Sequence, residues 1–314
     1  MQQIEYMKNQ RIVITGGAGF IGSHLTSTLV EMGNDVVVVD ILLRGNKIPK
    51  EVQSKIEFHQ VDVCDFDAMA KICKGADLIF HFAAILGVDI VADNPIETME
   101  TEVNGMQSIA HAASTNGISK LIYASTSGVY GHLALEQSVS EEILIDPRTS
   151  YAMAKRYNEI YLASLFEEKG VHSVALRFFN IYGLRQDNRM VIPRFIEQAF
   201  AGDPLTVYGT GEQTRDFTYI DDAIKATIHL AKSVKGFEIY NIANEKEATI
   251  LDLAQTIIDV TSSASEIKLI NAPSKRYDYE VGRRYGSSEK LDKKVGYKPT
   301  TELDNGLRII LTDN

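Results

Sequence analysis

A glycine-rich turn near the start of the chain constrains the fold most strongly. The stretch RIVITGGAGFIGSHL, at residues 11–25, reads as a buried strand that runs into glycines and then into a helix. Gly17, Gly19 and Gly22 fit the spacing GxGxxG, while Gly16, Gly19 and Gly22 fit GxxGxxG. Such glycines permit a tight turn and let the backbone approach a pyrophosphate, whose charge is met by the amides of the helix N-terminus. Alone the motif is weak, because glycines also form ordinary strand-to-helix turns.

The segment after this turn strengthens the prediction of a dinucleotide site. The next apolar run, DVVVVD, ends at Asp40, about 20 residues beyond the glycines, where such sites carry an acidic residue. A carboxylate there accepts hydrogen bonds from the adenine ribose hydroxyls and repels a 2′-phosphate, so we expect NAD rather than NADP. Phe20 and Ile21, which open the helix, are predicted to contact the cofactor together with the glycines. Arg44 and Lys47 follow closely, but a solvated loop is their expected place.

Strand-like and helix-like segments alternate through the first half of the chain. The strand-like runs are rich in Val, Ile and Phe with little alternation, as expected of strands buried on both faces. They begin at residues 11, 35, 56, 78, 121 and 172, and helix-like stretches fall at 20–32, 65–74, 97–116 and 151–169. This order predicts right-handed crossovers and an α/β, Rossmann-type doubly wound parallel sheet.

The second half has a more mixed pattern, with helix-like stretches near 191–201 and 219–232 and a strand-like run at 237. We therefore predict two domains. Residues 1–178 form the NAD-binding domain, and residues 179–314 form a smaller mixed α/β substrate-binding lobe. Part of 216–243 is expected to return to the first domain.

Charge and cysteine content exclude several classes of function. The formal net charge is -10, which leaves no basic excess to attract nucleic acid or an anionic membrane surface. The two cysteines, Cys64 and Cys73, form no CxxC or Cys/His cluster, so we expect neither a disulfide framework nor a metal site. The start, MQQIEYMKNQ, lacks the apolar core of a signal peptide, and no apolar run approaches the roughly 20 residues of a membrane span. We expect a soluble cytoplasmic protein.

Tyr151 and Lys155 form a candidate acid/base pair, four residues apart on one face of a predicted helix. A nearby ammonium and the positive nicotinamide ring favour phenolate, and lowering the tyrosine pKa by about three is worth roughly 4 kcal/mol. A tyrosine and a lysine four residues apart often occur by chance in helices. The location of this helix favours a catalytic role, because it follows LIYASTSGVYG, whose strand should end at the carboxyl edge of the sheet. Open α/β folds bind their ligands at that edge. Thr126 supplies a hydroxyl at that edge.

These segments together resemble the extended branch of the short-chain dehydrogenase/reductase superfamily, the NAD-dependent nucleotide-sugar epimerases and dehydratases. The resemblance spans nearly the whole chain and rests on eight motifs in the family's order. They are TGGAGFIGSH, the acid of DVVVVD, VDVCD at 61, HFAA at 81, STSGVYG at 125, YAMAK at 151, RFFNIYGLRQ at 177 and GTGEQTRDFTYIDD at 209.

The resemblance implies roles for further residues of the first domain. Asp62 and Val63 would hold the adenine, and Ala83 and Ala84 would line the dinucleotide cleft. Tyr151 would be the base. Lys155 would be its electrostatic partner and a ligand of the nicotinamide ribose, and Thr126 would bridge the phenol and the sugar.

In the second domain, the resemblance implies that Asn180 and Arg215 hold the nucleotide diphosphate. A third ligand would come from SKRYDYEVGRRYGSSEK at 274, which departs from the family's Arg-x-Gly-Asp pattern. Arg276 is the first candidate for this role, and Arg283 and Arg284 are alternatives. The resemblance also implies a uridine diphosphate carrier and a homodimer built on the helices at 97–116 and 151–169.

The expected reaction begins with oxidation at C4 of the sugar and gives a transient 4-keto intermediate. A family dehydratase would carry Asp-Glu after the threonine and a decarboxylase would carry Thr-Ser-Glu, but this chain has Ser127 and Gly128 there. The missing carboxylate favours a 4-epimerase. A dehydratase or decarboxylase stays open, because Glu136, Glu141 or Asp146 could supply an acid. A non-catalytic NAD- or nucleotide-sensing regulator is a second alternative, although Tyr151, Lys155 and Thr126 are all retained.

Overall fold

The computed structural model describes residues 7–85, 93–131, 138–271 and 282–312. The chain divides into two compact units. The first comprises Met1–Val129, Thr149–Arg177 and Thr227–Tyr240, and the second comprises Tyr130–Arg148, Phe178–Ala226 and Asn241–Asn314. The short segment Tyr130–Arg148 thus belongs to the second unit, although it lies inside the range 1–178 that the sequence assigned to one domain.

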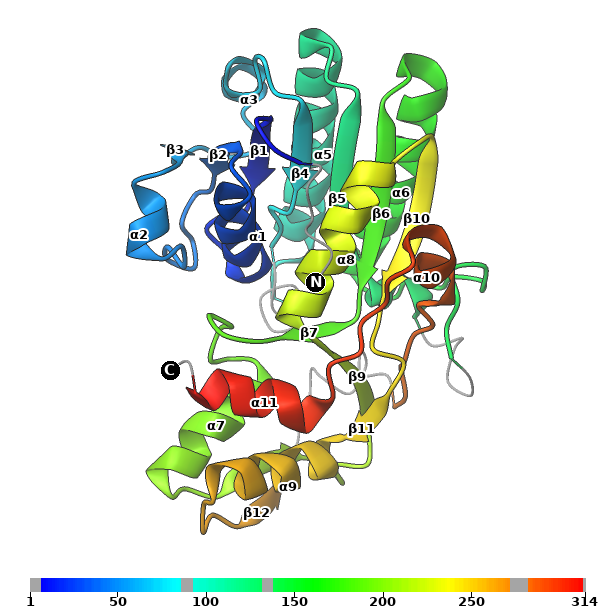
Figure 1. The fold of residues 1–314 in the computed structure, drawn as a ribbon. Helices are drawn as coiled ribbons and strands as arrows, with labels where there is room; N and C mark the ends of the chain where they lie inside the picture. The colour runs from blue at the N-terminus through cyan, green and yellow to red at the C-terminus, as the bar shows by residue number, and fades with distance from the viewer. Residues whose placement is uncertain (1–6, 86–92, 132–137, 272–281, 313–314) are drawn as a thin grey trace. The chain divides into compact units, whose positions relative to one another are not determined.

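A seven-stranded sheet forms the centre of the first unit (Figure 1). Its strands are β1 (Arg11–Thr15), β2 (Asp35–Val39), β3 (Glu57–His59), β4 (Leu78–His81), β5 (Lys120–Thr126), β6 (His172–Phe178) and β10 (Phe237–Ile242). They lie in the order β10-β6-β5-β4-β1-β2-β3, and β1 pairs in parallel with both β2 and β4. The chain therefore winds outward in two directions from β1 and β4, which confirms the predicted Rossmann-type α/β fold.

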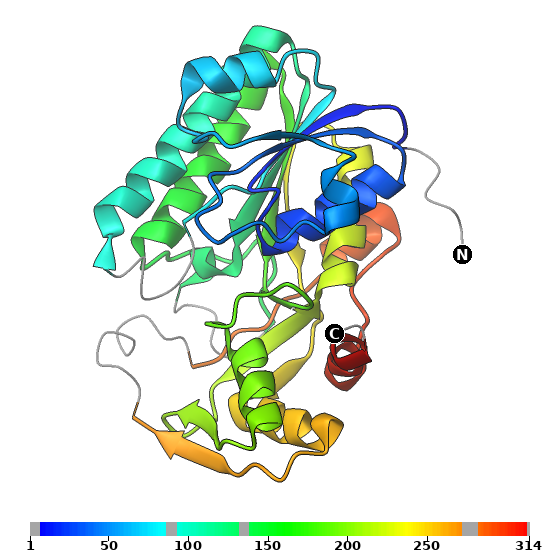
Figure 2. The same cartoon turned by 90° about the vertical axis from the view of Figure 1, so that its left-hand side faces the viewer.

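Helices cover both faces of this sheet. They are α1 (Phe20–Glu31), α2 (Lys50–Gln53), α3 (Phe66–Ile72), α5 (Pro95–Asn116), the 3-10 turn η1 (Ser127–Tyr130), α6 (Ser150–Lys169) and α8 (Ile220–Ser233). Figure 2 shows α3, α5 and α6 together on one face, with α1 on the other. Alternate strand residues such as Val13, Ile79 and Leu121 face α5 and α6 in one buried cluster, where they meet Met106 and Leu162.

Local signals explain why α6 begins and ends where it does. The Thr149 side chain accepts a hydrogen bond from the Ala152 amide at 3.1 Å and so caps the first turn. Gly170 ends the helix in the left-handed conformation, with φ of +70°, which glycine adopts at no steric cost. The helix therefore presents Tyr151 and Lys155 in its first two turns.

The second unit contains a smaller mixed sheet, as the sequence predicted. Its strands β7 (Asn180–Tyr182), β9 (Thr214–Tyr219) and β11 (Glu247–Thr249) lie in the order β11-β9-β7, while β8 (Leu205–Tyr208) pairs with β12 (Ile267–Ile270). Its helices are α7 (Val191–Ala201), α9 (Ile250–Thr261), α10 (Glu289–Val295) and α11 (Leu303–Thr312). Across the described ranges of both units, none of the helices combines the length and apolar character that a membrane-spanning segment needs.

Candidate functional site

The glycine turn lies where β1 and β4 end at the same edge of the sheet. Thr15 is paired with His81 in register, so the residues that follow each strand meet. A Cβ atom on Gly16 would lie 2.6 Å from the Ala83 nitrogen, and one on Gly22 would lie 2.1 Å from the Gly16 oxygen. These atoms belong to the backbone and cannot move aside, so the turn requires glycine at both positions. The structure thus brings the predicted cofactor residues Gly16, Gly22 and Ala83 into contact.

Asp40 holds this turn in place from the end of β2. Its Oδ2 accepts a hydrogen bond from the Ala18 amide at 3.0 Å, and its Oδ1 accepts one from the Leu42 amide at 2.8 Å. Burial raises the pKa of Asp40, and the backbone bonds to Leu42, Ala18 and Gly19 oppose the rise. The carboxylate therefore lies beside the glycine turn, as a ligand for a ribose must.

The N-terminus of α1 suits an anion. Gly19 caps the helix without a side-chain hydrogen bond, and the first turn, which holds Phe20 and Ile21, contains no acidic residue. The amides and the positive end of the helix dipole therefore meet no carboxylate within the first turn. A dinucleotide such as NAD fits these three features together: the tight glycine turn, the carboxylate at the end of β2 and the N-terminus of α1.

The remaining predicted cofactor residues lie on two loops at the same edge. Asp62 and Val63 follow β3, where Asp62 Oδ1 accepts a hydrogen bond from the Cys64 amide at 2.9 Å and Val63 is buried in the core. Ala83 and Ala84 follow β4, where the Ala83 amide donates to Thr15 Oγ1 at 3.3 Å. Within the described residues, no cluster of three or more His, Cys, Asp or Glu side chains could hold a metal ion.

Thr126 and the start of α6 meet at Gly128. The Gly128 amide donates a hydrogen bond to Thr126 Oγ1 at 3.0 Å. A Cβ atom on Gly128 would lie 3.3 Å from Thr126 Oγ1 and 3.6 Å from the Cβ of Ala152, the residue after Tyr151. The predicted catalytic hydroxyl of Thr126 is therefore held close to the turn of α6 that carries the tyrosine.

Lys155 forms a buried ion pair that the sequence analysis did not foresee. Its Nζ lies 2.9 Å from Oε2 of Glu102 on α5, and both side chains are almost fully buried. The same Nζ lies 4.7 Å from the ring centre of Tyr123 and 5.4 Å from that of Tyr151. A cation in such a place is stabilised by its carboxylate partner and by the faces of the two rings.

Burial and a nearby carboxylate act on the pKa of Tyr151. The sequence analysis expects Lys155 and the positive nicotinamide ring together to lower this pKa, whereas within the chain itself burial raises it and the negative charge of Glu102 raises it further. Burial is the larger cause, because a buried phenolate loses its hydration, and the carboxylate of Glu102 adds to the effect. In the chain without cofactor, both effects favour the protonated form of the Tyr151 hydroxyl.

Among the described residues, His81, Tyr123 and Asn158 pack near the ion pair. His81 donates to or accepts from Thr15 Oγ1 at 2.8 Å and stacks on Tyr123, and burial lowers its pKa to about 3. Asn158 donates hydrogen bonds to the Glu102 carbonyl and to the Tyr123 hydroxyl, at 3.0 and 2.9 Å. His81 is accordingly an uncharged packing residue.

A second buried ion pair fixes α6 against β5 and β6. Arg177 donates to both carboxylate oxygens of Glu159, at 2.8 and 2.7 Å, and the Ser125 hydroxyl donates to Glu159 Oε1 at 2.6 Å. Because Ser125 precedes Thr126 and Glu159 follows Lys155 by one helical turn, this network fixes the strand end relative to the helix.

Two arginines of the second unit, Arg215 and Arg284, lie close enough for their charges to interact. Arg284 is half-buried and donates a hydrogen bond to the Gly131 carbonyl at 2.9 Å, and desolvation together with the nearby charge of Arg215 lowers its pKa to about 10. Arg283 instead forms a bidentate pair with Glu247, with its Nε at 2.8 Å from Oε1 and its Nη2 at 2.7 Å from Oε2. Two neighbouring cations are typical of an anion site, so the geometry favours Arg284 over Arg283 as the partner of Arg215.

Asn180 lies on β7, the strand next to β9, which carries Arg215. It opens β7 and is paired in register with Phe217, two residues along β9 from Arg215. Arg276, the first choice of the sequence analysis for the third ligand, lies outside the described residues. The second unit thus brings Asn180, Arg215 and Arg284 onto neighbouring segments.

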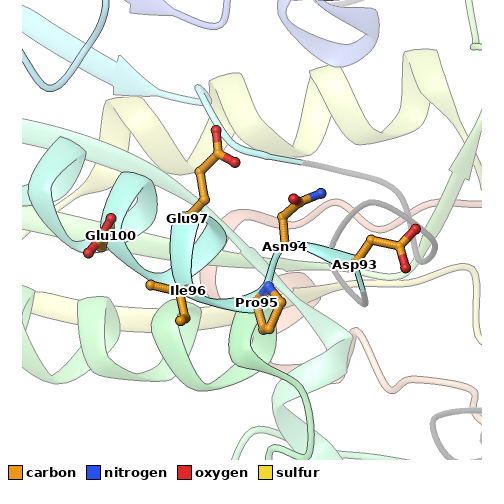
Figure 3. Close-up of a pocket in the computed structure, with 6 residues that line it drawn as sticks. All are labelled: Asp93, Asn94, Pro95, Ile96, Glu97 and Glu100. Carbon is orange, nitrogen blue, oxygen red and sulfur yellow. The ribbon is translucent and has the colours of Figure 1, made fainter.

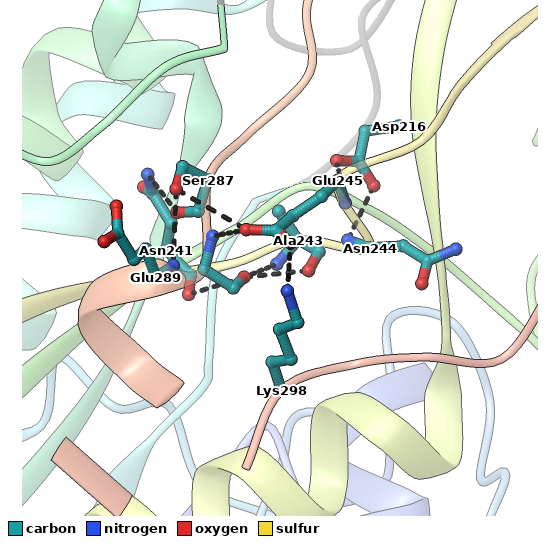
Figure 4. Close-up of polar contacts among 9 residues, drawn as sticks. Asp216, Asn241, Ala243, Asn244, Glu245, Ser287, Glu289 and Lys298 are labelled. Carbon is teal, nitrogen blue, oxygen red and sulfur yellow. Dashed lines mark hydrogen bonds and ion pairs between the residues drawn. The ribbon is translucent and has the colours of Figure 1, made fainter. Parts of the chain in front are cut away.

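Asp216 organises the segments that carry these arginines. It is fully buried and accepts hydrogen bonds from the amides of Asn244, Glu245 and Gly286, at 2.9, 3.0 and 3.1 Å. Glu245 continues the network to Lys298, as Figure 4 shows. The carboxylate therefore ties β9 to the segments that follow β10 and precede α10.

A surface pocket at the N-terminal end of α5 does not fit the predicted substrate. Its lining includes three carboxylates, and none of the predicted site residues contributes to it. The residues drawn in Figure 3 are Asp93, Asn94, Pro95, Ile96, Glu97 and Glu100. A nucleotide diphosphate would be repelled there, because like charges disfavour each other.

Sequence reasoning missed Glu102, although the sequence carried a signal for it. On α5 the buried positions include Thr98, Glu102, Met106 and Ile109, which recur with the period of one helix face. A carboxylate on the apolar face of a helix needs a buried partner, because an isolated buried charge is very costly.

The chain belongs to the NAD dependent epimerase/dehydratase family, whose match covers residues 12–243 of its 314 residues. This confirms the resemblance to the extended short-chain dehydrogenase/reductase superfamily, and NAD is the cofactor of the family.

The relatives of this chain do not all have the same activity. UDP-N-acetyl-alpha-D-glucosaminuronate decarboxylase from Bacillus cytotoxicus is 38% identical over 311 residues, which are 95% of this chain and 96% of the relative. The structure of UDP-glucose 4-epimerase with UDP-glucose from Thermotoga maritima has a TM-score of 0.90 at 28% identity, covering 96% of this chain and 97% of that chain. UDP-glucuronic acid 4-epimerase from Bacillus cereus, in complex with UDP-glucuronic acid and NAD, has a TM-score of 0.85 at 29% identity, covering 96% and 98%. The chain is thus similar both to epimerases and to a decarboxylase.

Proposed function

We propose that this chain is an NAD-dependent nucleotide-sugar 4-epimerase that acts on a UDP-sugar through a transient 4-keto intermediate. The observation that carries the proposal is Gly128, which touches Thr126 Oγ1 where the dehydratase and decarboxylase patterns place a carboxylate. Epimerisation needs no acid or base beyond the group that removes and returns the hydroxyl proton. The absence of a side chain at Gly128 is therefore compatible with this reaction and unfavourable for the others.

The proposed roles follow from the contacts of each residue. Gly16, Gly19, Gly22 and Asp40 would hold the dinucleotide, which when bound accepts and returns the two electrons of the C4 oxidation. Tyr151 removes the proton from the C4 hydroxyl and later returns it. Further proposed cofactor contacts are Phe20, Ile21, Asp62, Val63, Ala83, Ala84 and Lys155.

The proposed role of Thr126 is to orient the sugar, while Tyr151 acts as the base. Its Oγ1 accepts a bond from the Gly128 amide, which leaves its own proton for donation to the sugar oxygen or the phenol. The hydroxyl therefore orients the C4 oxygen towards Tyr151.

The acids considered as substitutes for the missing carboxylate have other partners in the second unit. Glu141 accepts a hydrogen bond from the Asn241 amide at 2.6 Å, and Asp146 pairs with Arg148 at 2.6 Å. Glu136 lies outside the described residues. These contacts support epimerisation over a reaction that needs a second acid.

Decarboxylation is the second candidate, because the Bacillus cytotoxicus relative, at 38% identity, is a decarboxylase. It would use the same C4 oxidation, after which a 4-keto sugar acid loses carbon dioxide. A non-catalytic sensor of nucleotides is the third candidate, but the retained Tyr151, Lys155 and Thr126 argue against it.

A proton NMR time course distinguishes the three candidates. The purified protein would be given NAD and, separately, UDP-glucose, UDP-N-acetylglucosamine and UDP-glucuronate, with parallel mass analysis of the products. We expect a new anomeric signal at unchanged mass for one of them. Loss of carbon dioxide or water would contradict epimerisation, and binding without any product would support the sensor.

We propose that the second unit holds the diphosphate through Asn180, Arg215 and Arg284. Arg284→Met should weaken UDP binding by at least tenfold, because it removes a cation that lies near Arg215 and could pair with the diphosphate. Arg283→Met is the matched control and should change affinity by less than threefold, since Arg283 is already paired with Glu247. Calorimetric titration with UDP measures both, and equal losses would contradict this assignment.

We also propose that the chain forms a homodimer through α5 and α6, as the resemblance implies. Met153, Tyr157 and Ile160 lie on one face of α6 and are 44%, 43% and 56% exposed. Ile160→Glu should therefore halve the mass measured by light scattering. Phe200→Glu, at an apolar residue of α7 that is 65% exposed, should not; a monomeric wild-type protein would refute the dimer.

A further inference from the structure

The Glu102–Lys155 pair lies beside the proposed base, Tyr151. Its Nζ to Oε2 distance is 2.9 Å, both side chains are almost fully buried, and the Tyr151 ring centre lies 5.4 Å from the same Nζ. The Glu159–Arg177 pair, by contrast, bonds to Ser125. The charge of Lys155 is therefore shared between a permanent partner, Glu102, and a phenol that is to gain and lose a proton.

We propose that Glu102 is a positioning residue that fixes Lys155 by a buried ion pair and, by neutralising its charge, keeps the Tyr151 hydroxyl protonated at neutral pH. The inference rests on the proposed role of Tyr151 as the base. Phenolate beside a lone ammonium is favoured, whereas phenolate beside a neutral ion pair is not. Glu102 would thus set the pH at which the tyrosine becomes an effective base.

Three described groups near the pair, His81, Tyr123 and Cys64, carry no charge at neutral pH. On β4 His81 is neutral, since burial lowers its pKa to about 3. On β5 the Tyr123 hydroxyl is bound by Asn158, and burial raises the pKa of Tyr123. On the segment after β3, burial raises the pKa of the Cys64 thiol to about 12.

The charged residues near the pair on α5 and α6 also have partners of opposite charge. On α6 the charge of Glu159 is matched by Arg177 and Arg156. Burial raises the pKa of Glu102 itself, while Lys155 opposes the rise and the Ile85 amide adds a hydrogen bond. Besides burial, the Glu102 carboxylate is therefore the charge that acts on the pKa of Tyr151, and Lys155 is the ion-pair partner of Glu102.

The test is a tyrosinate titration of the full chain without any nucleotide, followed by ultraviolet absorbance. The chain has 14 tyrosines, so the signal of Tyr151 is taken as the difference between each protein and its Tyr151→Phe counterpart. In Glu102→Gln the uncompensated Lys155 should lower the midpoint for Tyr151 by at least about one pH unit, a tenfold change in proton affinity. Glu97→Gln, an exposed residue of the same helix, is the matched control and should leave the midpoint unchanged.

A charge cycle separates this role from a merely structural one. The double variant Glu102→Gln, Lys155→Met removes both charges and should return the midpoint to near its wild-type value. If the unpaired lysine keeps Glu102→Gln from folding, Glu102→Asp, which withdraws the carboxylate by one methylene, should give a smaller shift in the same direction. An unchanged midpoint in the folded single variants would overturn the proposal.

The titration is independent of turnover, so its failure and the failure of the proposed function can be told apart. With a substrate found by NMR, the acidic limb of the pH–rate profile of Glu102→Gln should move to lower pH by the same amount as the tyrosinate midpoint. A role in folding alone would lower the rate at every pH and leave the limb in place.

Discussion

Replacing Tyr151 by phenylalanine is expected to lower turnover of a UDP-sugar by at least about a thousandfold, within the range for loss of a positioned acid/base group. The substitution deletes only the phenol oxygen. The ring remains beside Lys155, where the ammonium lies 5.4 Å from its centre. Folding and NAD affinity should therefore stay within about twofold of the wild-type values, so that the loss appears in kcat.

The matched control is Tyr157→Phe on the same helix. Tyr157 is 43% exposed and stacks on Tyr161 through its ring, which the substitution keeps. The turnover rate of the Tyr157→Phe variant should match that of the wild type. Steady-state kinetics and calorimetry with NAD measure both variants, and a Tyr151→Phe protein with a tenth or more of the wild-type rate would remove Tyr151 from the proposed role.

Local patterns made most of the first unit predictable from the sequence. Strands buried on both faces appear as uninterrupted apolar runs, as in β1 and β2, and the helix that carries Tyr151 has a threonine cap and a terminal Gly170. The glycine turn was predictable for the same reason, since Gly22 approaches Gly16 within the motif itself, although the approach of Gly16 to Ala83 joins distant segments. Elements that depend on residues close together in the sequence could therefore be predicted from local patterns.

Contacts between distant segments could not be predicted with the same certainty. The pairing of Glu102 with Lys155 joins α5 to α6, and a glutamate in an amphipathic helix ordinarily faces solvent. The choice between Arg283 and Arg284 depended on Glu247, which binds the first of them from β11. In each case the deciding partner lies far away in the sequence.

The second large effect is expected at Asp216. The Asp216→Asn variant should lower the free energy of unfolding by about 2–4 kcal/mol, because an amide has one acceptor oxygen where the carboxylate has two, and turns an NH2 group towards backbone donors. Asp216 Oδ1 accepts from the Asn244 amide and the Thr218 hydroxyl, and its Oδ2 accepts from the amides of Glu245 and Gly286. At least one buried amide would therefore lose its partner.

The measurement should be made at about pH 8, since burial raises the pKa of Asp216 to about 6 and the wild-type carboxylate is then ionised. Urea unfolding of the full chain gives the global change. Hydrogen exchange adds a local reading, because the amides of Asn244, Glu245 and Gly286 should exchange at least tenfold faster in the variant. Asp221→Asn, the same change at an exposed position, should alter the free energy by less than about 0.5 kcal/mol.

The Asp216→Asn variant should also weaken UDP binding, although Asp216 is not expected to touch the ligand. Arg215 precedes Asp216 on β9, and Arg284 lies two residues before Gly286, whose amide the carboxylate binds. Loosening these bonds lets the two arginines separate, which their mutual repulsion favours. UDP affinity should fall while NAD affinity, which depends on the glycine turn of the first unit, stays constant. Equal losses for the two ligands would instead indicate general unfolding and would contradict a local role for Asp216.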